Sequence, residues 1–124
     1  MTELIERDTA TRTRWLRICR LDDLETGWGE AALVDGDQIA LFRLAGDELY
    51  AVQHSDPVSG ACVMARGITG SRTVEGQQRR TLASPLHKEI YDLADGRCYS
   101  DESLRLRTYP VRCIDDWLEI GAAA

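Results

Sequence analysis

The sequence lacks any long hydrophobic run. No apolar stretch among its 124 residues approaches the ~20 residues that a membrane-spanning helix needs. Residues 1–8 are charged and contain no apolar core of a secretory signal peptide. We therefore expect a cytoplasmic protein with a single hydrophobic core, which buries roughly 65% of the surface that the unfolded chain exposes.

The chain also lacks a block of positive charge. It has 15 lysine and arginine residues against 21 aspartate and glutamate residues, which gives a formal net charge of −6. The adjacent Arg79 and Arg80 are too small a patch to attract a polyanion. A nucleic-acid partner is therefore not expected.

The four cysteines are not spaced as metal ligands. Cys19, Cys62, Cys98 and Cys113 form no C-x-x-C pair, and no histidine stands at ligand spacing from them. In a cytoplasmic chain this pattern is typical of buried or free thiols rather than disulfides. Cys62 is followed by two apolar residues, and we expect it to be a small apolar filler.

Glycine motifs that bind nucleotides are absent as well. The chain has no dinucleotide fingerprint. Residues 67–71 resemble a phosphate loop only faintly, because no lysine or helix follows them, and we predict a turn there. The sequence thus contains no site for a redox nucleotide.

What the sequence does contain is a series of short strand-like segments separated by turns. Asp35-Gly36 between two apolar runs is the strongest hairpin signal, and Gly76 and Gly96 mark further turns. A short helical turn is expected over residues 21–27. The expected strands are residues 15–19, 30–34, 38–44, 49–53, 72–75, 79–83, 89–92, 104–109, 111–114 and 117–120. So many short strands favour an all-β domain with antiparallel neighbours.

Three segments carry further expectations. Residues 1–12 are polar and aperiodic, so we predict a disordered tail before a domain over residues 13–121. Residues 54–70 show no strand alternation and are predicted to be a long ordered loop. Within residues 104–109, the two leucines should face inward and the two arginines outward.

Residues 84–96 resemble the second cluster-binding loop of the Rieske iron–sulfur family. In that family a C-x-x-H motif and an earlier C-x-H motif together hold a [2Fe–2S] cluster. The corresponding positions here are Ser84 and His87 in the second loop and Asp56 and Val58 in the first. Three of the four ligands are replaced, and oxygen donors match a thiolate-ligated iron poorly. The resemblance implies an all-β Rieske-like fold, a small antiparallel sandwich or barrel with a two-loop tip, and no cluster.

A Rieske-like frame without its ligands is similar to the small-subunit family of the assimilatory NAD(P)H nitrite reductase. The resemblance covers most of the chain from Trp15 onward and is carried by residues 56–68, 83–88, 93–98 and 109–112. It implies an accessory subunit of an enzyme that reduces nitrite to ammonium in nitrate and nitrite assimilation. The large subunit is the expected partner and is expected to carry FAD, an iron–sulfur cluster and sirohaem. This chain is expected to carry no cofactor and no catalytic residue.

The polar residues of these loops are interpreted as structural. His87 should anchor its loop by hydrogen bonding, and His54, on the strand face of Val52, should be partly buried. Asp56 precedes a proline and can hold its loop by accepting backbone N–H bonds. A metal site at His87 would need more ligands of matched softness. A hydrolytic triad of Asp56, Ser84 and His87 is disfavoured because no nucleophile elbow surrounds Ser84.

The tip between the two loops is expected to present an apolar surface. The residues expected to fill or cap it are Val58, Ala61, Val63, Met64, Pro85 and Leu86. The expected docking surface for the large subunit consists of Met64, Arg66, Pro85, Leu86 and Lys88. The alternative is that the apolar residues only repack the volume that a cluster would occupy.

Two other functions stay open at this point. One is a Rieske-type ferredoxin that carries electrons to an oxygenase, against which the residues at the ligand positions argue. The other is a stand-alone binding module on the same fold, because a fold does not by itself fix a function.

Overall fold

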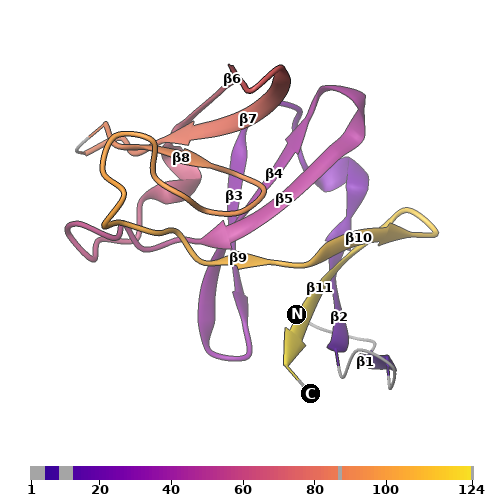
Figure 1. Cartoon of the computed structure of the whole chain (residues 1–124). Coiled ribbons are helices and arrows are strands. Elements are labelled where there is room, and N and C mark those ends of the chain that lie inside the picture. The colour runs from indigo at the N-terminus through magenta and orange to yellow at the C-terminus, as the bar shows by residue number, and fades with distance from the viewer. Residues whose placement is uncertain (1–4, 9–12, 87, 124) are drawn as a thin grey trace.

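The computed structural model describes residues 5–8, 13–86 and 88–123, which form three antiparallel sheets (Figure 1). The first sheet has the order β1 (Ile5–Asp8), β2 (Thr13–Arg20), β11 (Trp117–Ala123), β10 (Val111–Ile114). The second has the order β3 (Gly29–Val34), β4 (Asp37–Leu44), β5 (Glu48–Gln53), β9 (Thr108–Tyr109). The third has the order β6 (Ile68–Val74), β7 (Gln77–Ala83), β8 (Ile90–Asp92). The 3₁₀ helices are η1 (Leu21–Asp23), η2 (Ala45–Asp47) and η3 (Met64–Arg66).

The second sheet is the middle layer, and β4 is buried on both of its faces. Ile39 and Leu41 pack with residues of the first sheet such as Ile120 in one hydrophobic cluster. Ala40 and Phe42 point to the other face, into a second cluster that includes residues of the third sheet. A strand covered on both faces reads as a continuous apolar run, which is the pattern of residues 39–42.

The predicted turns at Asp35-Gly36 and Gly76 are confirmed, and a third hairpin turn shares their geometry. Asp35-Gly36 joins β3 to β4, residues 75–76 join β6 to β7, and residues 115–116 join β10 to β11. Both residues of each loop have positive φ, as a type I′ turn requires. This turn matches the right-handed twist of the strands that it joins.

The structure differs from the sequence-based expectation in several segments. Residues 5–8, expected within a disordered tail, form β1 and pair with β2, so the prediction is wrong for them; residues 1–4 and 9–12 lie outside the described residues. The middle loop ends earlier than predicted: β6 begins at Ile68, where a turn was expected. Only residues 108–109 of the predicted strand 104–109 form β9.

The predicted alternation within residues 104–109 holds even where the strand does not. Leu106 is buried and Leu104 half-buried, whereas Arg105 and Arg107 are exposed. The backbone N–H of Leu106 bonds the carbonyl of Gly96 instead of a neighbouring strand. The burial of these side chains therefore follows the alternating sequence pattern, whereas the hydrogen-bond partner of the Leu106 backbone lies in an earlier turn.

The thiols are free at all four cysteines. Cys98 is buried and Cys19 half-buried, whereas Cys62 and Cys113 are exposed. The expectation that Cys62 is an apolar filler is therefore wrong. No helix in the described part of the chain is long and apolar enough to cross a membrane.

Gly96 is the position where the backbone leaves least room for a side chain. Its φ is +81°, and a Cβ there would overlap the carbonyl oxygen of Leu106. Gly36 has a similar φ of +84°, but no atom lies within 4 Å of the place that a Cβ would take. Gly36→Ala should lower the free energy of unfolding by about 1–2 kcal/mol, the cost of a left-handed alanine. Gly96→Ala should lower it by at least about 3 kcal/mol, because steric overlap adds to that cost.

Chemical denaturation of the two variants measures both losses. Equal losses would show that the contact between Gly96 and Leu106 does not constrain the fold.

Candidate functional site

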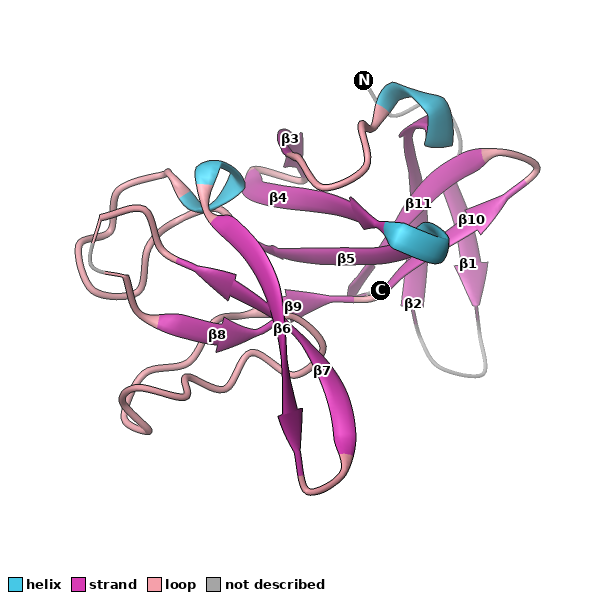
Figure 2. Ribbon diagram, turned by 90° about the horizontal axis from the view of Figure 1, so that it is seen from above, coloured by secondary structure: helices cyan, strands magenta, loops and turns pink. Residues whose placement is uncertain are grey.

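The two loops singled out by sequence lie at the same end of the molecule, away from the first sheet (Figure 1, Figure 2). The first loop, residues 54–63, leaves β5 and leads into η3. The second loop, residues 84–89, joins β7 to β8. We call these two loops together with η3 the tip.

His54 fastens the first loop to η3. Its carbonyl oxygen accepts the N–H groups of Val63 and Met64 at 3.0 and 2.9 Å, and its Nδ1 accepts the N–H of Ala65 at 3.1 Å. The residue is buried, with 8% of its surface exposed, which confirms the structural role predicted for it. Burial lowers the pKa of His54, and the positive charge of Arg66 lowers it further. The imidazole therefore stays neutral, as its acceptor role at Nδ1 requires.

Asp56 holds the first loop in shape from inside. Its N–H bonds the carbonyl of Ala61, and its own carbonyl accepts the N–H of Gly60, both at 2.7 Å. Its carboxylate accepts the N–H of Val58 at 3.2 Å and the hydroxyl of Ser59 at 3.0 Å. Only 1% of Asp56 is exposed. The prediction that Asp56 accepts backbone N–H bonds is confirmed.

Ser84 plays the equivalent part in the second loop. Its N–H bonds the carbonyl of Glu89 at 2.9 Å, and its carbonyl accepts the N–H of Lys88 at 3.1 Å. Its Oγ accepts the N–H of Leu86 at 3.3 Å, and only 2% of the residue is exposed. A buried hydroxyl engaged with its own loop is not presented as a nucleophile. The expectations for His87 fall on a residue outside the described part of the chain.

The residues at the Rieske ligand positions do not fit a [2Fe–2S] cluster. Such a cluster takes thiolate or imidazole donors, whereas Asp56 and Ser84 offer oxygen that already accepts hydrogen bonds, and Val58 offers no donor. Among the described residues, no group of three or more His, Cys, Asp or Glu side chains could hold a metal ion. The cysteine nearest in sequence to the first pair of ligand positions is Cys62, whose exposed thiol lies six residues after Asp56.

The surface of the tip is apolar with two cationic residues beside it. Val58 and Leu86 are 48% and 50% exposed, and Pro85 is exposed as well. Arg66 and Lys88 are exposed at the ends of η3 and the second loop. Ala61 and Val63 are half-buried.

Met64 does not belong to that surface. It was expected in the docking set, but its exposed fraction is 0% and it packs with Phe42, Leu82 and Tyr91 in the cluster between the second and third sheets. Met64 therefore ties η3 to the core, and the prediction that it docks a partner is corrected.

Sequence reasoning missed a charged network that braces the third sheet behind the tip. The carboxylate of Asp92, with 0% exposed, accepts bonds from Arg79 Nε at 2.7 Å, the Tyr99 hydroxyl at 2.6 Å and the N–H of Ala94 at 2.8 Å. Burial alone would raise the pKa of Asp92, but these hydrogen bonds together lower it. An aspartate that follows a buried tyrosine at a strand end was the available signal. Its side-chain partners Tyr99 and Arg79 are 7 and 13 residues distant, too far for a local pattern to identify them.

The low pKa of His54 predicts a pH dependence of stability. The unfolded chain binds a proton near the ordinary pKa of 6.5, whereas the folded chain resists it, so the free energy of unfolding should fall as the pH drops below about 6.5. His54→Gln should remove this slope, because a glutamine oxygen can accept the Ala65 N–H without titrating.

Denaturant titrations between pH 7.5 and 5.5 measure the slope, with His87→Gln as the matched control that should retain it. A slope that survives in His54→Gln and disappears in His87→Gln would contradict the assignment.

Comparisons with known proteins agree with this geometry. The family model of the Rieske-like [2Fe-2S] domain matches residues 14–121. The nitrite reductase (NADH) small subunit of Salmonella typhimurium is 35% identical over 109 residues, which cover 87% of this chain and 97% of that protein. The NMR structure of the Escherichia coli protein NirD has a TM-score of 0.77 at 30% identity and covers 90% of this chain, which in turn covers 99% of that structure.

A longer relative also contains a matching segment. The nitrite reductase NAD(P)H large subunit of Klebsiella oxytoca is 37% identical over 107 residues, which cover 86% of this chain and 11% of that protein. The predicted all-β Rieske-like fold and the predicted family are both confirmed. The chain belongs to the Rieske-like [2Fe-2S] domain family and, within it, to the nitrite reductase small subunits.

Proposed function

We propose that this chain is the accessory small subunit of a cytoplasmic NAD(P)H-dependent nitrite reductase and that it transfers no electrons itself. The observation that carries the proposal is the combination of a match over nearly the whole length of nitrite reductase small subunits with oxygen and apolar side chains at three ligand positions. The reduction of nitrite to ammonium would take place on a large subunit that holds FAD, an iron–sulfur cluster and sirohaem.

The partnership with a large subunit has support from the Klebsiella oxytoca protein. In that protein a segment similar to this chain is about a tenth of one longer polypeptide, which is named a large subunit. Two units that occur within one polypeptide in one species and as separate chains in another are expected to work side by side. A separate small subunit must then recognise its partner through a surface.

The absence of a cluster follows in this proposal from the chemistry of the loops. The side-chain oxygen atoms of Asp56 and Ser84 accept hydrogen bonds from groups of their own loops. These bonds give each loop a fixed shape that no metal has to impose. The loops would then serve as a recognition surface rather than a redox centre.

The exposed part of the tip is the surface that we assign to docking. Val58 and Leu86 present apolar area, Pro85 stiffens the second loop, and Arg66 and Lys88 add positive charge. Apolar residues surrounded by charge are the usual composition of a protein interface. Met64 contributes from beneath by fixing η3.

Reconstitution with the large subunit tests the function directly. The chain, purified without oxygen, should be folded, colourless and free of iron, and it should form a complex that oxidises NAD(P)H with nitrite. Iron near the two atoms per chain of a [2Fe–2S] centre, with a charge-transfer band, would restore the electron-carrier alternative. A folded chain that does not bind the large subunit would contradict the accessory role.

Charge reversal tests the docking surface. Arg66→Glu combined with Lys88→Glu should weaken binding of the large subunit by about tenfold or more, because charged groups at an interface control association. Arg105→Glu, an exposed arginine in the segment before β9, is the matched control and should leave the affinity unchanged. Isothermal titration calorimetry gives the Kd values. Equal affinity for the double variant and the control would exclude the tip as the contact.

A further inference from the structure

The second sheet has a free edge at β3. In the sheet order, β4 is the neighbour of β3, and no hydrogen bond outside that ladder involves the β3 backbone within the described residues. The strand is six residues long; Trp28 directly before it and Leu33 near its end are 66% and 71% exposed. A free edge with exposed apolar side chains is a template for pairing with another extended segment.

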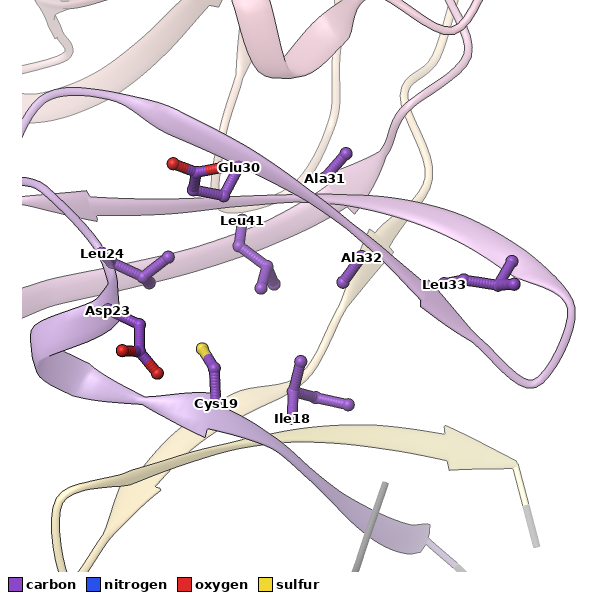
Figure 3. A pocket seen from close by; sticks show the side chains of 9 residues that line it. All are labelled: Ile18, Cys19, Asp23, Leu24, Glu30, Ala31, Ala32, Leu33 and Leu41. Carbon is purple, nitrogen blue, oxygen red and sulfur yellow. The ribbon is translucent and has the colours of Figure 1, made fainter. Parts of the chain in front are cut away.

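A hollow of about 500 Å³ runs beside this edge, between β3 and the end of β2 (Figure 3). Leu24 and Leu41 are buried and form its floor, and the half-buried Ile18 and Cys19 line the β2 side. No backbone hydrogen bond joins β2 to β3 in the part of the chain that the structure describes, so the two strands border the hollow without closing it. The volume is within the roughly 300–1,000 Å³ typical of binding pockets.

The bulge in β2 explains why two successive residues face the hollow. Arg17 pairs with Glu119 and Cys19 with Leu118, so Ile18 is the extra residue. A bulge of this kind redirects side chains at a sheet edge. The β2 side of the hollow is therefore lined by both Ile18 and Cys19.

The hollow is acidic at one end and apolar at the other. Asp23 and Glu30 place their carboxylates on one side, and Leu33 lies at the opposite end of β3 (Figure 3). Both carboxylates are on exposed residues. Burial raises the pKa of the Cys19 thiol to about 11, and the negative charges of Asp23 and Glu30 contribute to that rise. The local potential in the hollow is thus negative.

We propose that an extended segment of the large subunit adds to the edge of β3, with a basic side chain between Asp23 and Glu30 and an apolar side chain beside Leu33. This inference rests on the proposed function and names a second contact in addition to the tip. Glu30 shares the face of its partner Leu41, whereas Leu33, three residues later, points to the opposite face of the sheet. Successive residues of an added strand also alternate between the two faces, so one segment can supply both side chains. The main chain of β3 would provide affinity, and the two carboxylates at the hollow would select a segment with a basic side chain.

A second copy of this chain does not suit the site. Residues 29–34 contain Glu30 and no basic residue, so pairing β3 with β3 would bring carboxylates to an edge that is already acidic. Like charges set opposite each other on paired strands are destabilising. The complementary charge has to come from a different protein.

Amide hydrogen exchange on the complete complex tests the added strand. The β3 amides that face the free edge should exchange at least about tenfold more slowly in the complex than in the isolated chain, because they gain hydrogen-bond partners. The amides bonded to β4 serve as the internal reference. Unchanged exchange throughout β3 in a complex that has formed would overturn the inference and leave the proposed function intact.

Two exposed substitutions provide the second test. Glu30→Lys and Leu33→Asp should each weaken binding of the large subunit by about tenfold, whereas Glu102→Lys, the same charge change before β9, should not. Thermal unfolding would establish that each variant is folded. Affinities equal to the control would overturn the inference, as would protection of β3 that grows with the concentration of the isolated chain and so indicates self-association. Failure of the wild-type chain to bind at all would instead refute the proposed function.

Discussion

The burial of β4 on both faces is the constraint on which the rest of the fold depends. Ile39 and Leu41 belong to the hydrophobic cluster shared with the first sheet, and Ala40 and Phe42 to the one shared with the third. A slip of one residue would exchange these faces and move Phe42 into the space of its smaller neighbours. The register of β4 with β3 and β5 is therefore fixed. The first and third sheets pack against the two faces of β4, so their positions depend on that register.

That constraint reaches the tip through close packing. Gly29 on β3 leaves no room for a side chain, because a Cβ there would overlap the carbonyl oxygen of Ala65 and the ring of Phe42. η3 can therefore lie against the middle sheet, with Met64 fully buried. His54, directly after β5, then fastens the loop to η3 by hydrogen bonds with the N–H groups of Met64 and Ala65. The shape of the tip is set by apolar packing and backbone bonding.

Much of this could be read from the sequence where the determinant is local. The turn at residues 35–36 was predictable because both positions must adopt positive φ, and Asp56 because an aspartate before proline caps its own loop. The burial of Met64 was not, since it depends on Phe42 and Leu82, which are distant in the chain. The Asp92 network and the pairing of β1 with β2 were not predicted from the sequence for the same reason. Local patterns specify turns and faces, whereas partners across sheets require the assembled fold.

The pairing of β2 with β11 has a consequence for how this unit can be used in larger proteins. Thr13 lies opposite Ala123, so the matched family domain, residues 14–121, begins and ends at adjacent positions on the first sheet. Domains with neighbouring ends can be transplanted into a host polypeptide without stretching either one. The tip and the β3 edge belong to other parts of the structure (Figure 1). The same unit can thus be encoded separately or built into a longer chain, with neither the tip nor the β3 edge at the junctions.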